Sequence, residues 1–349
     1  MPCKAGAARH HNAMITDLFV VTSGIDAETV ANAVPPACRR DPSSAAVITA
    51  SGSELLFALP EWRPRAPSRH LLPSLSMLTD VPYAARFELS ALAGGTWSPW
   101  VATVTIGPGA FADLPTAVDG LACDVDVYTA AAPVERVRLR IRVGAPHVQS
   151  LAASPWMATL SASDLVPSPS HPIGVPAARI PVPALSQLEA PPEIAMRICS
   201  PTSVAMVLAH WGAPASPVAL ADDLFHAPTD SYGVWPAAVR AAGRRGVAGY
   251  LLRFPDWPSA AWCLGRKLPI IASVRYAAGE LTDAPLSETS GHLLVLTGGD
   301  RTHVFVNDPV ASTVAEVPRR YALEEIEHVW IGRAGVGYVL FAPAAIRSE

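Results

Sequence analysis

The strongest constraint on the fold is a strict alternation of polar and apolar residues in the first half of the chain. Residues 136–143 read Arg-Val-Arg-Leu-Arg-Ile-Arg-Val, so every second side chain is apolar. Successive side chains of a β-strand point to opposite faces, and this segment therefore predicts a strand with one buried and one solvated face. Similar short runs predict further strands at 18–22, 46–50, 55–59, 85–89, 100–106 and 123–129.

These strands favour an antiparallel β-sandwich over residues 14–162. They are separated by Gly, Pro and Ser, and the region has almost no helical periodicity. Residues 1–13 carry no periodic signal, and we expect a disordered start there. Residues 163–183 contain six prolines and few large apolar residues, a composition typical of a semi-rigid extended linker. We therefore place a domain boundary at 163–183 and a second domain at 184–349.

The second domain begins with helices and continues with strands. Apolar residues at Val204, Val207, Leu208 and Trp211 have the spacing of one helix face, which predicts a helix over 200–211. The remaining pattern predicts helices at 217–226, 236–244, 322–328 and after an Asp256 N-cap, and strands at 249–253, 269–276, 291–297, 302–307 and 337–342. Helices followed by antiparallel strands indicate an α+β domain.

Composition excludes several classes of protein. Half of the 349 residues are hydrophobic and the formal net charge is −4, which argues against disorder and against nucleic acid as a partner. No run approaches the ~20 apolar residues of a membrane span, and the N-terminus lacks the apolar run of a signal peptide. The five cysteines have no C-x-x-C spacing. We therefore expect a soluble cytoplasmic protein with no membrane partner and no disulfide framework.

Cys199 is the first candidate for chemistry. It directly precedes the helix predicted at 200–211, with Pro201 in the first turn. Unpaired N–H groups and the positive end of the helix dipole favour a thiolate at this position. The alternative is a thiol that packs as a small core residue beside Ile198.

His292 and Asp308 flank a predicted β-hairpin. A three-residue loop at 299–301 would pair His292 with Asp308, and a two-residue loop at 299–300 would pair it with Asn307. In either register a carboxylate or an amide could hold the imidazole in one orientation. The structural alternative is a hydrogen-bonded histidine at a strand start and a turn aspartate before Pro309.

These segments together resemble a known family. Ile-Cys-Ser-Pro-Thr-Ser at 198–203, Gly-His at 291–292, and Val-Asn-Asp-Pro at 306–309 are similar to the peptidase C39-like family of the papain-like cysteine peptidases. The resemblance implies a papain-like α+β fold, a nucleophile at Cys199, a base at His292 and an orienting carboxylate at Asp308. The lead-in at 180–187 further implies an oxyanion donor at Gln187. Bacteriocin-processing members carry Asp-Cys-Gly-Pro at the nucleophile, so double-glycine cleavage is not implied.

The expected function is therefore a cysteine peptidase or amidohydrolase acting on a peptide or another amide, without cofactor or metal. An acyltransferase would use the same thioester on Cys199, and a binding module with an inactive site would keep the fold without the reaction. The sequence indicates no partner for the N-terminal domain.

Overall fold

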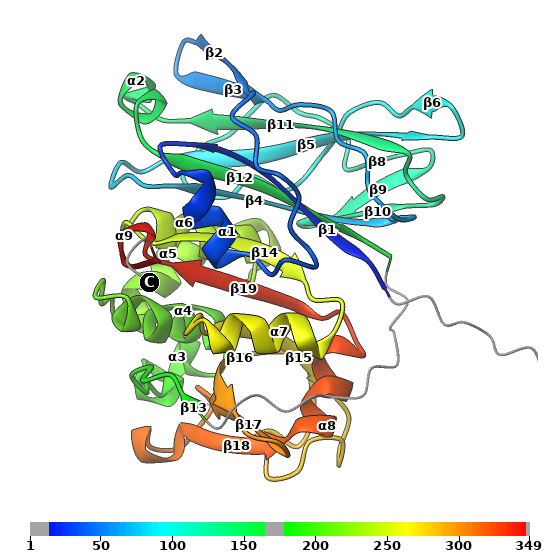
Figure 1. Ribbon diagram of the computed structural model, residues 1–349. Coiled ribbons are helices and arrows are strands. Elements are labelled where there is room, and N and C mark those ends of the chain that lie inside the picture. The colour runs from blue at the N-terminus through cyan, green and yellow to red at the C-terminus, as the bar shows by residue number, and fades with distance from the viewer. Residues whose placement is uncertain (1–13, 165–177, 347–349) are drawn as a thin grey trace, which may run out of the picture.

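The computed structural model describes residues 14–164 and 178–346 (Figure 1). The expected disordered start at 1–13 and residues 165–177 of the expected linker lie outside this part, as do residues 347–349. The chain is a mixed α/β protein with three antiparallel sheets.

Two of the sheets are built by the N-terminal half. The middle sheet has the order β1(Thr16–Ser23), β12(Trp156–Ser163), β4(His70–Met77), β10(Val127–Ala130), β9(Leu121–Asp124), β8(Ala117–Val118). The outer sheet has the order β2(Val47–Ser51), β3(Glu54–Ala58), β11(Arg136–Gly144), β5(Ala84–Ala93), β6(Thr96–Trp97), and β7(Val101–Ala102) also pairs with β5. Short helices α1(Ala27–Ala33) and α2(Val148–Ala152) interrupt the strands.

The N-terminal strand predictions need three corrections. The strand predicted at 123–129 is two strands, β9 and β10, because Val125 turns the chain with a φ of 56°. The strand predicted at 100–106 is reduced to β7 and an isolated bridge at Ile106. The long strands β4 and β12 were not predicted at all. They are buried on both faces and therefore show no polar–apolar alternation.

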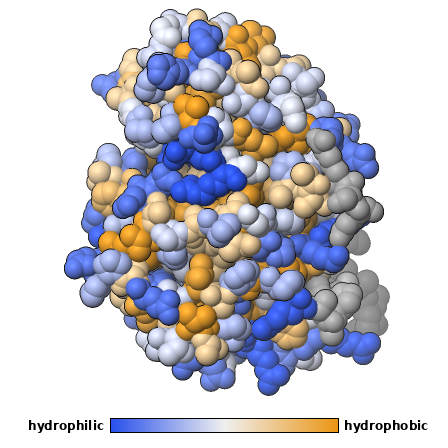
Figure 2. Space-filling view, turned by 90° about the vertical axis from the view of Figure 1, so that its left-hand side faces the viewer, coloured by the Kyte–Doolittle hydropathy of each residue, from blue (hydrophilic) through white to orange (hydrophobic). Residues whose placement is uncertain are grey.

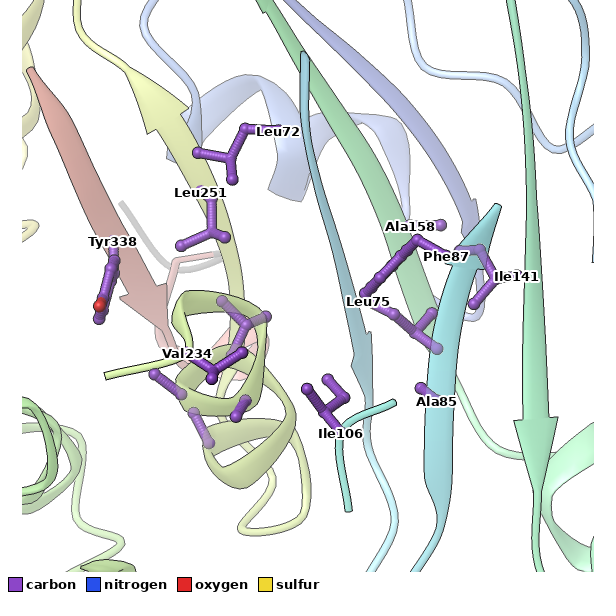
Figure 3. Packing of buried hydrophobic residues seen from close by; sticks show 14 of the residues in the cluster. Leu72, Leu75, Ala85, Phe87, Ile106, Ile141, Ala158, Val234, Leu251 and Tyr338 are labelled. Atoms are coloured by element: carbon purple, nitrogen blue, oxygen red, sulfur yellow. The ribbon is translucent and has the colours of Figure 1, made fainter. Parts of the chain in front are cut away.

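Strands β4 and β12 of the middle sheet are buried on both faces because they lie between the outer sheet and the C-terminal half (Figure 1). Leu75 of β4 and Ala158 of β12 pack against Phe87 and Ile141 of the outer sheet, whereas Leu72 faces the C-terminal half (Figure 3). Phe57 of β3 and Trp156 of β12 add an edge-to-face ring contact at 5.1 Å. One hydrophobic core thus contains residues from both halves of the chain.

The C-terminal half is built on the third sheet. Its order is β14(Ala248–Arg253), β19(Val336–Phe341), β15(Ile270–Tyr276), β16(Thr289–Gly299), β17(His303–Asn307), β18(Pro318–Ala322), and β13(Ala178–Arg179) also pairs with β16. The helices are α3(Pro192–Ala195), α4(Cys199–His210), α5(Pro217–Leu224), α6(Trp235–Gly243), α7(Trp257–Gly265), α8(Leu323–Ile326) and α9(Pro343–Ile346). The helices and strands predicted here are present, and β18 was not predicted.

The middle sheet also covers the edge of the C-terminal sheet. β14 is an edge strand, and its outward N–H groups would otherwise be unpaired. The N–H of Leu251 donates to Ser74 Oγ at 3.3 Å, and the N–H of Arg253 donates to Ser161 Oγ at 3.1 Å. At Gly243, the end of α6 approaches β4 so closely that a Cβ would lie 2.7 Å from the Met77 carbonyl oxygen. Small side chains at these positions let the two halves pack backbone against backbone.

The surface is mixed in character. On the face shown in Figure 2, hydrophobic side chains reach the surface in separate small patches among hydrophilic ones. Within residues 14–164 and 178–346, no helix combines the length and apolarity needed to cross a membrane.

Candidate active site

Cys199 is the first residue of α4, which begins one position earlier than the helix predicted at 200–211, and its side chain is half-buried. No side chain caps this helix end, since Ile198 occupies the N-cap. The opening N–H groups of a helix have no acceptor within it. The backbone amides of Ser200 and Leu293 both lie within hydrogen-bonding reach of the Cys199 thiol. α4 is held on β16 by Ser203, whose Oγ donates to the Leu293 carbonyl at 3.2 Å.

His292 and Asp308 lie together beneath the thiol. His292 Nε2 is 2.8 Å from Asp308 Oδ1, and the two side chains are 2% and 0% exposed. Because Nε2 is taken by Asp308, the ring presents Nδ1 as its second nitrogen. The Val310 N–H also donates to Asp308 Oδ1, at 3.2 Å, in a local turn of the type that Asp commonly makes. Tyr321 Oη donates to Oδ2 at 2.9 Å, so both carboxylate oxygens are held.

The predicted hairpin register is wrong, although the two side chains meet. Val295 pairs with Asn307, so His292 is not directly opposite Asp308. At the loop, Gly299 pairs with Val304, three residues from the predicted register, and a bulge between Leu296 and Gly298 reduces this shift to two on the side of His292. An even shift leaves each side chain on its predicted face. His292 and Asp308 therefore meet as diagonal neighbours.

The alternative partner Asn307 points elsewhere. Its amide nitrogen donates to the Val182 carbonyl at 3.0 Å and the Pro183 carbonyl at 3.4 Å. Asn307 thus holds the backbone where the chain enters the C-terminal half, and Asp308 is the residue that binds the imidazole.

The electrostatics of the site favour an ion pair. Burial opposes the thiolate, but the hydrogen bond and charge of His292 and the amides of Leu293 and Ser200 outweigh it and lower the pKa of Cys199. Burial likewise opposes an imidazolium, and the Asp308 carboxylate and the Cys199 sulfur together raise the pKa of His292. Asp308 stays ionised because His292, Tyr321 and the Val310 amide lower its pKa against burial.

The other three cysteines that the structure describes have the opposite character. Burial raises the pKa of Cys38 to about 12 and raises the pKa of Cys123 and Cys263 still further. Acidic neighbours or a neighbouring thiol add to this effect at each of the three. The environment beside His292 is therefore what distinguishes Cys199.

Gln187 lies between the Asp308 loop and the turn before α4. Its backbone N–H donates to the Pro309 carbonyl at 2.9 Å, and its side-chain Nε2 donates to the Ala195 carbonyl at 2.7 Å. The side chain is fully buried, and Oε1 has no partner among the described residues. Gln187 thus connects the segments that carry Asp308 and Cys199, and Ala195 occupies one of its amide N–H groups.

Tyr321 contacts Asp308, but the sequence did not predict it as a residue of the site. It belongs to β18, whose Arg-Arg-Tyr-Ala run gives little alternation, and only the pairing of β18 with β17 brings its hydroxyl within reach of Asp308. Within the described ranges, no group of three His, Cys, Asp or Glu side chains is arranged to hold a metal ion.

Comparison with known proteins gives one family. Residues 179–338 match the sequence model of the Peptidase_C39 like family. A crystal structure of a Bacillus anthracis protein described as a C39-like peptidase is similar with a TM-score of 0.35 and 17% identity, over 46% of this chain and 94% of that one. No curated protein matches the sequence. The matched segment contains Cys199, His292, Asp308 and Gln187, and it is this C-terminal segment that is similar to the Peptidase_C39 like family.

Proposed function

We propose that the protein is a cysteine peptidase or amidohydrolase that cleaves an amide bond through a thioester on Cys199. His292 acts as the base and Asp308 orients it. The observation that carries this proposal is the chain of contacts at the start of α4, where the Cys199 thiol lies beside His292 and Asp308 holds the other ring nitrogen at 2.8 Å. These contacts support the proposed roles of an activated nucleophile, its base and an orienting group.

The first half of the reaction forms the thioester. The Cys199 thiolate attacks the carbonyl carbon, and the carbonyl oxygen becomes an oxyanion. The imidazolium of His292 then gives its proton to the leaving amine as the carbon–nitrogen bond breaks. Asp308 stabilises the imidazolium until that transfer and keeps the ring in one tautomer.

The second half regenerates the thiol. His292, now neutral, takes a proton from water, and the hydroxide attacks the thioester carbonyl. The carbon–sulfur bond breaks, the carboxylic acid leaves, and Cys199 and His292 return to the ion pair. An amine in place of water would give acyl transfer from the same intermediate.

The oxyanion needs hydrogen-bond donors. The N–H of Cys199 is one candidate, because it opens α4 and has no acceptor within the helix. The second N–H of the Gln187 amide is the other, beyond the one that Ala195 accepts. If Gln187 is an oxyanion donor, Gln187→Ala should lower kcat roughly 10²–10³-fold while iodoacetamide still labels Cys199 at an unchanged rate. A change in labelling together with a lower Tm would instead make Gln187 structural.

We assign the N-terminal half a supporting role. The proposal is that its two sheets form a β-sandwich that stands against the C-terminal sheet and shapes the approach to Cys199. The support is the shared hydrophobic core and the burial of the middle sheet on both faces.

The test is iodoacetamide labelling between pH 5 and 9, resolved by cysteine with mass spectrometry. We expect Cys199 to be labelled near pH 6, where an ordinary thiol with a pKa of about 8.5 is almost entirely protonated. His292→Ala should abolish this low-pH labelling, and His147→Ala, at an exposed histidine in the N-terminal half, should not. Cys38, Cys123 and Cys263 serve as internal controls.

Peptide libraries then identify the cleaved bond, and added amine distinguishes hydrolysis from acyl transfer. A Cys199 that reacts only above pH 8 would contradict the peptidase proposal. Together with a biological effect that survives Cys199→Ala, that result would leave the inactive binding module as the function.

A further inference from the structure

A pocket of about 550 Å³ lies between the two halves of the chain. Its N-terminal wall includes Asp124, Asp126 and Thr129 at the β9–β10 hairpin, and His70 and Ser163 on the middle sheet. Its C-terminal wall includes residues before and at the start of α6 and at the ends of β14, β15 and β19, among them Trp235, Arg253, Arg275 and Val336. About half of the lining thus comes from outside the family-matched segment 179–338. The volume is in the range of small-molecule and peptide-side-chain sites.

The pocket contains buried polar groups that lack partners. Ser163 is 1% exposed, and its Oγ has no hydrogen-bond partner among the described residues. His70 Nδ1, on the neighbouring strand, is unpartnered in the same way, and His70 and Ser163 are direct cross-strand neighbours. Buried polar atoms are nearly always satisfied in native proteins. Both residues line the pocket, so its N-terminal wall carries hydrogen-bonding groups that the described residues do not satisfy.

The acidic wall contains a buried carboxyl group, Asp126. Asp126 is 7% exposed, and its Oδ2 accepts the Trp235 N–H at 2.7 Å. No Arg, Lys or His of the described residues forms an ion pair with it. Burial raises the pKa of this carboxyl to about 7. The charged form is unfavourable because the carboxyl is removed from water and no described cation pairs with it.

The basic wall does not supply that counter-ion. The Arg253 guanidinium donates to the carbonyls of Phe254 and Ile331, the latter at 3.0 Å, and is 3% exposed. Arg275 is exposed on the far side of the pocket. A ligand that places a positive group on Asp126 can therefore direct its carbonyl groups toward these arginines.

β19 runs from the pocket toward the candidate active site, although Cys199 and His292 do not themselves line the pocket. Val336 lines the pocket, and Tyr338 is two residues further along the same face of the strand (Figure 3). The Tyr338 hydroxyl lies close to the side chain of Ser200, next to the nucleophile. Burial raises the pKa of Tyr338, and the charges of Asp126 and Cys199 raise it further, so its hydroxyl is within electrostatic reach of both groups.

We propose that this pocket binds a cationic group of the peptide substrate, an amine or a guanidinium, on the Asp126 carboxylate. The inference rests on the proposed peptidase function and specifies its substrate: peptides with a basic side chain or a free α-amino group near the scissile bond. The N-terminal half then determines specificity, because it contributes Asp126.

The test is equilibrium binding to the full chain carrying Cys199→Ala, which cannot consume the ligand. Three tripeptide amides are compared by calorimetry at pH 8: acetyl-Ala-Lys-Ala, Ala-norleucine-Ala with a free amino group, and acetyl-Ala-norleucine-Ala as the neutral control. At least one cationic peptide should bind roughly tenfold more tightly than the neutral one. The lysine peptide reports a side-chain site, and the free-amine peptide reports an N-terminal site.

Asp126→Asn keeps an oxygen for the Trp235 N–H and should reduce the preference to less than about twofold. Asp119→Asn, at an exposed aspartate of the same strand region, should leave it unchanged. Thr129→Arg is a second variant at an exposed lining position, and it should block cation binding by placing a guanidinium in the pocket.

Equal binding of all three peptides, or a preference that survives both Asp126→Asn and Thr129→Arg, would overturn the pocket assignment. The peptidase proposal and the pocket proposal can be refuted independently. An inert Cys199 with an intact cation preference contradicts the peptidase alone, and an active Cys199 without that preference contradicts the pocket alone.

Discussion

The chemistry of Cys199 depends on its neighbours. Cys38 and Cys263 are fully buried and Cys123 is half-buried like Cys199, yet only Cys199 has an imidazole and two backbone amides against its sulfur. The same residue type therefore has a raised pKa at three places and a lowered one at the fourth. Placement at a helix start is visible in the sequence, but the imidazole that decides the sign of the shift arrives from 93 positions downstream.

Tyr321 is predicted to support the site through Asp308. Tyr321→Phe removes the donor to Asp308 Oδ2 and leaves a buried carboxylate oxygen without its hydrogen bond, which should cost about 1–3 kcal/mol of unfolding free energy. A less firmly held Asp308 should also shift the pH midpoint of Cys199 labelling upward. Tyr276→Phe is the matched control, because the Tyr276 hydroxyl is buried near Asp308 and has no hydrogen-bond partner among the residues that the structure describes. Equal effects of the two variants would contradict this role.

Asp126 is predicted to lower the free energy of unfolding at high pH. Its folded-state pKa of about 7 lies above the ordinary value of 3.8, so the folded state binds the proton more tightly than the unfolded state. The unfolding free energy should therefore fall as the pH rises from about 4 through 7. Asp126→Asn should abolish this loss and be more stable than the parent by roughly 2–4 kcal/mol at pH 8. Urea unfolding at pH 5 and pH 8 measures the difference, and a constant difference would refute it.

At the scale of elements, a side chain can be assigned to the correct face of a strand even when the pairing of the strand is predicted out of register. The hairpin of β16 and β17 is three residues from the predicted register at its loop, and the bulge between Leu296 and Gly298 reduces this to two. His292 and Asp308 therefore keep their predicted face, because the side-chain period of a strand is two. An odd error would have placed Asn307 beside the imidazole instead. Face assignments from alternation are thus more robust than residue pairings, which depend on the loop that Asp300 shapes.

The hydrogen bond between the Ser161 hydroxyl and the edge strand β14 leads to a prediction about stability. Ser161→Ala leaves the buried Arg253 N–H unpaired and should cost about 1–3 kcal/mol of unfolding free energy. Ser163→Ala changes the same residue type on the same face of β12, where no described residue forms a hydrogen bond with the hydroxyl, and should cost much less. Thermal unfolding of the two variants side by side tests this. Equal losses would show that the hydrogen bond to β14 contributes nothing.

At the scale of the whole molecule, the two halves depend on each other. Residues of β4, β12 and β5 share one hydrophobic core with residues of α4, α6 and β19. A second core joins β1 and α1 to β14, α7 and β15. Figure 1 shows β4 and β12 stacked directly over β14. The C-terminal half would lose a layer of its packing without the middle sheet.

We therefore predict that residues 178–349 alone do not fold cooperatively, whereas the full chain unfolds in one transition. The fragment exposes the β14 edge and the apolar face that the middle sheet covers, and such an edge promotes aggregation. Circular dichroism melting and gel filtration of the fragment measure the outcome. A cooperative melt with the midpoint of the full chain would contradict the prediction.

The sequence by itself determined what depends on local periodicity and end signals. Alternation identified β11, the Asp256 cap identified α7, and the apolar stripe identified α4 with Cys199 at its start. Tertiary structure decided the rest. The strands β4 and β12 are buried on two faces and carry no periodic signal, and Tyr321 and Asp126 reach their partners only through pairing and packing across the fold. Local backbone preferences are encoded by near neighbours, whereas contacts between distant segments depend on how complete elements pack.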